Sequence, residues 1–109
     1  RTVAANLDWA SEPLRGRLKK DQTMLALQPE FLEAVLEVIR PGFSHLSLQV
    51  STIADQLSIG EQVVVDALKI LIWKGQLDVD LTQSIQRTNT INVLSKSYFI
   101  ERSSYGVAG

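Results

Sequence analysis

The sequence predicts a mainly α-helical domain with a small β hairpin, in the order of a winged helix-turn-helix. Two stripes of apolar residues at helical spacing are separated by a short polar turn, and a glycine follows the second stripe. The apolar spacing then changes from the helical repeat to strict alternation, which is typical of a half-buried strand. Helix, helix, tight turn, helix and hairpin is the order of elements in a winged helix.

We divide the 109-residue chain into three parts. Residues 1–28 form an N-terminal segment with a basic helix, residues 29–94 form the winged-helix domain, and residues 95–109 form a tail that we expect to be mobile. Ser11, Glu12 and Pro13 predict the start of the N-terminal helix, because proline fits the first helical turn. The chain begins with arginine instead of methionine, so we expect it to be a piece of a longer protein.

Three amphipathic helices are predicted in the winged-helix domain. The first opens at Pro29 and stops at Pro41 and Gly42. The third begins with a capping box formed by Ser58 and Glu61 and ends at Gly75. The apolar stripes of the three helices are, in order, Leu32, Val35, Leu36 and Ile39; Val50, Ile53, Ala54 and Leu57; and Val64, Ala67, Leu68, Leu71 and Ile72.

The hairpin is predicted from the alternation that follows the third helix. Leu77, Val79 and Leu81 alternate with polar residues and indicate one strand, and residues 90–94 indicate a second. Between them, residues 82–89 are polar, and we expect them to form a flexible loop, the wing.

Composition excludes several classes of function. The absence of cysteine rules out disulfides, thiolate metal sites and thiol nucleophiles. The formal net charge is -1, which gives no overall attraction to nucleic acid. Basic residues gather within 1–20 and acidic residues within 30–80. No apolar run approaches the roughly 20 residues that cross a bilayer, so a reducing cytoplasm is the expected compartment.

We expect no active site within this chain. His45 is the only histidine, and a single loop histidine is typical of a solvated or capping residue. Asp78 and Asp80 point to the same side of one predicted strand, which is compatible with a metal-binding pair but favours the wet face of the strand. The Glu-x-Lys and Gln-x-Lys pairs of restriction-type nucleases are missing, as is a glycine-rich phosphate loop.

The outward face of the third helix is our candidate for a protein interface. It carries one acidic, one basic and two apolar side chains, whereas a helix that reads bases favours arginine, asparagine and lysine. Trp73 would serve as an aromatic anchor for a partner. The alternative is that Trp73 folds under the hairpin as part of the core. The proposed interface residues are Gln62, Val65, Asp66, Lys69 and Trp73.

Two basic regions are candidates for contact with nucleic acid. One is the cluster of the N-terminal segment and the other is the wing. A solvated helix face and an ordinary loop are the respective alternatives. The residues are Arg15, Arg17, Lys19, Lys20 and Arg87.

Two stretches resemble the C-terminal domain of TnsA, the endonuclease subunit of heteromeric cut-and-paste transposases. They are VAANLDWASEPL (residues 3–14) and ALKILIWKGQLDVDLTQSI (residues 67–85). Family members often open this domain with an Asn-x-x-Trp-like stretch, here Asn6 and Trp9. They leave the third helix through a Leu-Ile … Asp-Leu segment, here residues 71–72 and 80–81. The tail after Leu94 shows no family pattern.

The resemblance implies a winged-helix domain that engages the ATPase regulator TnsC and lies near transposon-end DNA beside the transposase TnsB. It also implies that the catalytic carboxylates, the lysine and the magnesium belong to a preceding restriction-endonuclease-like domain. A DNA-binding regulator and a purely structural module of a larger assembly are the alternative functions.

Overall fold

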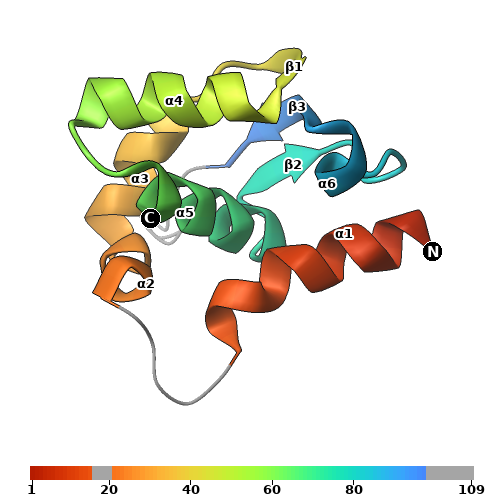
Figure 1. Cartoon of the computed structure of the whole chain (residues 1–109), viewed down its shortest axis with the longest axis horizontal. Helices are drawn as coiled ribbons and strands as arrows, with labels where there is room; N and C mark the ends of the chain where they lie inside the picture. Colours follow the sequence, from red (N-terminus) through yellow and green to blue (C-terminus); the bar gives the residue numbers. More distant parts are fainter. Residues whose placement is uncertain (16–20, 98–109) are drawn as a thin grey trace, which may run out of the picture.

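One helix, α5 (Glu61–Trp73), lies at the centre of the computed structural model, with the other elements around it (Figure 1). The structure describes residues 1–15 and 21–97. A three-stranded antiparallel sheet, in the order β1-β3-β2, packs at one end of the helices. The remaining elements are α1 (Thr2–Ser11), the 3-10 helix η1 (Glu12–Leu14), α2 (Asp21–Ala26), α3 (Pro29–Val38), β1 (Gly42–His45), α4 (Leu46–Leu57), β2 (Leu77–Val79), α6 (Ile85–Thr88) and β3 (Thr90–Lys96). The chain is therefore mostly helical with a small sheet, as the sequence predicts.

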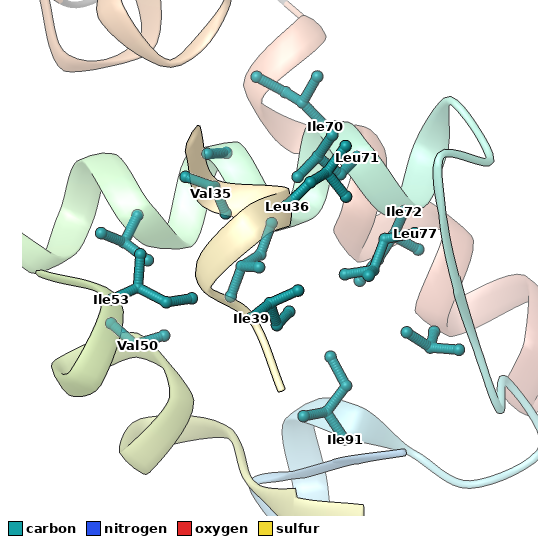
Figure 2. Close-up of a cluster of buried hydrophobic side chains, with 14 of the residues drawn as sticks. Val35, Leu36, Ile39, Val50, Ile53, Ile70, Leu71, Ile72, Leu77 and Ile91 are labelled. Carbon is teal, nitrogen blue, oxygen red and sulfur yellow. The ribbon is translucent and has the colours of Figure 1, made fainter. Parts of the chain in front are cut away.

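The predicted apolar stripes form the core. Those of α3 and α5 are buried throughout, and α4 contributes Val50, Ile53 and Ala54. Figure 2 shows side chains of α3, α4 and α5 meeting Leu77 and Ile91 from the sheet. Burial of these side chains provides the main driving force for folding.

Gly75 ends α5 as predicted. Its φ of 77° lies in the left-handed region, where glycine carries no side-chain penalty. The N–H of Gly75 donates to Ile72 O at 3.1 Å, and the N–H of Gln76 donates to Leu71 O at 2.9 Å. This pair of bonds is a Schellman motif, which satisfies the last carbonyls of the helix.

The predicted capping box at the start of α5 is wrong. Ser58 adopts the left-handed conformation, with φ 53°, at the C-terminal end of α4, where its N–H donates to Ala54 O and Asp55 O. The N-cap of α5 is Gly60, which provides no side-chain hydrogen bond. Ser58 therefore terminates one helix and cannot also occupy the capping position of the next.

The sheet contains a strand that the sequence analysis does not predict. Gly42–His45 pairs with β3, so that Phe43 lies opposite Asn92. On the other side of β3, the register with β2 shifts between Asp78 and Val79. The predicted hairpin is therefore extended by a strand on its β3 side.

The segment 82–89 is not the flexible loop that we expected. It contains the short helix α6, in which the side chain of Ile85 is only 2% exposed. The Ser84 hydroxyl accepts a hydrogen bond from the N–H of Arg87, and Asn89 ends the helix in the left-handed conformation. Burial of Ile85 and these two caps order the wing.

The N-terminal boundaries also differ from the prediction. Ser11 is the last residue of α1, a helix that the sequence pattern did not predict, and also the N-cap of the 3-10 helix η1, so the helix predicted from Ser11 is only three residues long. At the other end, β3 continues to Lys96, opposite Leu77. Residues 98–109 of the expected tail lie outside the described residues. Within the described ranges, no helix is long and apolar enough to cross a membrane.

The core position of Leu68 generates a stability prediction. Leu68 is 1% exposed on α5, so Leu68→Ala should lower the free energy of unfolding by about 2–5 kcal/mol. The matched control Leu94→Ala, at a side chain that is 56% exposed, should change it by less than about 0.5 kcal/mol. Urea denaturation followed by circular dichroism measures both. Equal effects would mean that Leu68 does not lie in the core.

Candidate functional site

The outer face of α5 is largely covered by the chain's own N-terminal segment. Figure 1 shows α1 lying beside α5 on the side opposite α4, and α2 lying near the other end of α5, next to α3. Asp66 and Lys69, predicted to face outward, are 6% and 8% exposed. That part of the prediction is wrong, because a second layer of helices packs over the polar side of α5. Every residue from Asp66 to Ile72 is buried.

Asp66 accepts hydrogen bonds from a residue of α2 and from a residue of α5. Thr23 Oγ1 on α2 donates to Asp66 Oδ2 at 2.8 Å. Gln62 Nε2, one turn earlier on α5, donates to Asp66 Oδ1 at 3.3 Å. A buried carboxylate without such donors would destabilise the fold. Asp66 therefore attaches α2 to α5.

Lys69 attaches the end of α1 and η1 to the same face. Its Nζ lies 2.8 Å from Glu12 Oε1 and 5.1 Å from the centroid of the Trp9 ring. The ring face attracts the ammonium group, and the carboxylate balances its charge. The lysine side chain is 11% exposed and the glutamate side chain 46% exposed, so the pair lies at the edge of the contact.

Asn6, which was not among the predicted site residues, joins α1 to the wing. Its Nδ2 donates to Leu81 O and Gln83 O, both at 2.9 Å, and its Oδ1 accepts from Ile85 N at 3.1 Å. The sequence carries a signal for this role. Asn6 is spaced with Trp9 and Ala10 as i, i+3 and i+4, which places the amide on an apolar helix face.

The accessible part of the predicted interface is confined to the ends of α5. Gln62 is exposed near the first turn, Trp73 is 47% exposed at the last residue, and Val65 is half-buried against the core. The alternative that Trp73 belongs to the core is wrong. Gln62 and Trp73 remain the members of the set that a partner can reach.

The predicted nucleic-acid residues do not converge. Arg15 follows η1, and its Nη1 lies 3.5 Å from Asp8 Oδ1 in an exposed ion pair. Arg87 is exposed on α6, which lies near the opposite end of α1 (Figure 1). Arg17, Lys19 and Lys20 lie outside the described residues.

The polar residues considered for catalysis occupy separate positions. His45 is exposed at the N-cap of α4 and makes no side-chain cap. Asp80 accepts hydrogen bonds from Thr82 Oγ1 at 2.6 Å and Thr82 N at 2.9 Å, and these donors lower the pKa of its carboxyl group. Asp80 is therefore engaged in a local turn. Within residues 1–15 and 21–97, no group of three histidine, aspartate or glutamate side chains is placed to hold a metal ion.

We compared the chain with protein-family models, curated proteins and solved structures, and none of them matched.

The contact between α2 and α5 generates a second stability prediction. Thr23→Val keeps the shape of the side chain but removes the shorter hydrogen bond to Asp66, and should cost about 1.5–3 kcal/mol. Gln62→Ala removes the longer, more exposed bond and should cost less than about 1 kcal/mol. Urea denaturation of both variants provides the measurement. If Thr23→Val proves as stable as the wild type, α2 does not hold Asp66 in solution.

Proposed function

We propose that this chain is a non-catalytic winged helix-turn-helix module of a TnsA-like transposase endonuclease subunit. In this proposal it docks a TnsC-like ATPase and helps to position transposon-end DNA beside a TnsB-like transposase. The succession α3, β1, α4, α5, β2, α6, β3, in which α6 lies in the wing, and the sheet order β1-β3-β2 support a winged helix. The short turn between α4 and α5 corresponds to the helix-turn-helix.

The observation that carries the protein-binding role is the covering of α5. A winged helix that reads bases inserts the helix after the turn into the major groove. Here α1, η1 and α2 occupy the outer side of that helix, and its buried charges are engaged by Thr23 and Glu12. The exposed remainder, led by Trp73, has the aromatic character of a protein-binding anchor.

Surface charge near the turn between α4 and α5, at the opposite end of α5 from Trp73, also argues against contact with DNA there. Asp55 on α4, Glu61 at the start of α5 and Asp21 at the start of α2 are all exposed. Carboxylates near the turn repel the phosphates of DNA. Lysine and arginine attract the phosphates, and their binding releases counterions from the DNA. Contact with DNA is therefore assigned to the arginines outside the turn, Arg15 and Arg87.

The residues that carry the resemblance have structural roles compatible with the proposal. Asn6 hydrogen-bonds to the wing, and Trp9 is 6% exposed beneath Lys69. Leu71 and Ile72 are core residues of α5. These positions hold the N-terminal segment, α5 and the wing together, which is what a shared architecture would require of them.

The ATPase contact is tested with Trp73. Trp73→Ala should weaken binding to the TnsC-like ATPase of the same transposon by about tenfold or more, because buried aromatic anchors dominate interface energies. The melting temperature should stay close to that of the wild type, because the side chain is 47% exposed. Leu94→Ala, an apolar control on β3, should leave the affinity unchanged. Surface plasmon resonance measures the affinities, and full-strength binding by Trp73→Ala would contradict an anchor role.

The DNA contact is tested by salt dependence. Arg87→Gln should flatten the slope of log K against log salt by up to about 0.9 for random duplex DNA, as expected for one lost phosphate contact. Gln62→Lys on α5, which keeps a donor beside Asp66, and Gln56→Lys on α4 add the same charge at exposed positions and should have equal, small effects. Fluorescence anisotropy measures the slopes. A much larger gain in DNA affinity for Gln62→Lys than for Gln56→Lys would show that α5 enters the groove and would favour the DNA-binding regulator.

A further inference from the structure

A groove of about 240 Å³ opens beside α4, remote from the outer face of α5. Its lining is mainly apolar and comes from the segment after α3, from β1 and from the first half of α4. The lining residues are Arg40, Ser44, Leu48, Gln49 and Thr52. None of these residues takes part in the contacts described for α1, η1 or α2.

The floor of the groove is fixed by a side chain that binds backbone. Gln49 is 4% exposed, and its Nε2 donates to Arg40 O at 2.8 Å while its Oε1 accepts from Arg40 N at 3.3 Å. This two-point bond holds α4 against the end of α3. The shape of the groove is therefore formed before any partner arrives, which lowers the entropic cost of binding.

One of the lining residues, Ser44, carries an unsatisfied polar group. Ser44 Oγ is buried and has no hydrogen-bond partner in the described structure. A buried hydroxyl without a partner costs free energy in the isolated chain, and a ligand that supplies the missing bond removes that cost. Two further lining side chains are accessible to a ligand. Leu48 is 59% exposed. Arg40 is also exposed, and its guanidinium group forms no ion pair with the described residues.

The strand beside the groove leaves backbone groups without a sheet partner among the described residues. Within 1–15 and 21–97, β1 pairs only with β3, so it is an edge strand of this sheet. Leu46 N–H donates to Asn89 O at 2.8 Å, and the alternation of antiparallel bonds then directs the N–H and C=O of Phe43 away from β3. An extended peptide uses such an edge, whereas a phosphate backbone does not.

We propose that this groove binds a short peptide segment of a partner protein in which a carboxylate stands beside an apolar side chain. The carboxylate pairs with Arg40, the apolar side chain packs on Leu48, and a polar group of the peptide completes the hydrogen bonding of Ser44. Charge complementarity selects an acidic peptide, and the apolar lining with a single cation disfavours nucleic acid. The inference rests on the proposed protein-binding function and adds a surface separate from Trp73.

The test starts from random peptides displayed on phage and selected on the whole chain. Enriched peptides should place aspartate or glutamate next to leucine, isoleucine, valine or phenylalanine. A synthetic copy of the most enriched peptide should bind about tenfold more tightly than its amide version, in which asparagine or glutamine replaces the acid. Arg40→Glu should reverse this order and favour a lysine version of the peptide, and Leu48→Asp should abolish binding.

The Ser44 hydroxyl provides a readout that a merely structural role would not give. Ser44→Ala should raise the melting temperature of the free chain, because an unsatisfied buried hydroxyl is removed, and should lower the peptide affinity. Arg87→Glu and Leu94→Asp are the matched controls, with the same changes at exposed positions outside the groove lining, and should bind the peptide normally.

The inference is overturned if no peptide is enriched, if Arg40→Glu and Leu48→Asp bind like their controls, or if all four variants lose binding equally. It is also overturned if Arg40→Glu lowers affinity for random duplex DNA more than Arg87→Glu does, which would make the groove a nucleic-acid contact. Trp73→Ala separates the two proposals. If Trp73→Ala loses ATPase binding but still binds the peptide, both proposed surfaces are supported. If Trp73→Ala binds the ATPase normally while a specific peptide binds the groove, only the anchor role of Trp73 is overturned.

Discussion

Burial of α5 on all sides is the constraint on which the rest of the structure depends. A central helix made only of apolar residues would need no particular neighbour, but Asp66 and Lys69 lie in its buried stretch. Each charge requires a partner in a place where water cannot provide one. Thr23 and Glu12 fulfil that requirement, so the N-terminal segment is an integral part of the domain. The two pairs also fix where α2 and η1 sit along α5.

This arrangement determines which surfaces remain accessible to other molecules. In a simple helix-turn-helix the helix after the turn presents the largest functional face. Here that face is internal, and the exposed surface near the turn is acidic through Asp55 and Glu61. Accessible aromatic and apolar groups lie instead at the C-terminal end of α5, on the outer side of the sheet at Phe43, and beside α4 at Leu48. The accessible apolar groups thus form several small sites rather than one broad face.

Sequence patterns predicted the elements whose contacts are local or periodic. The α3 and α5 stripes and the Gly75 stop follow from helical spacing and backbone conformation, which neighbouring residues determine. The strand at Gly42–His45 and the helix α6 depend on pairing with β3 and on burial of Ile85, and short polar sequences carry no such information. At the candidate site, the sequence left Trp73 open between the surface and the core, and the side chain lies at the surface. Asp66 and Lys69 were wrongly placed there, because a helical repeat shows which face opposes the core but not whether another helix covers it.

The bonds of Asn6 have a consequence for the order in which the chain folds. They join residues separated by 75 to 79 positions, so they close a loop that contains most of the domain. Such closure costs more chain entropy than the local helical contacts, and non-local contacts tend to slow folding. The α3–α4–α5 helices have short connections and can associate early. The contacts of Asn6 with the wing cannot be complete in a chain still emerging from the ribosome until residue 85 has been released.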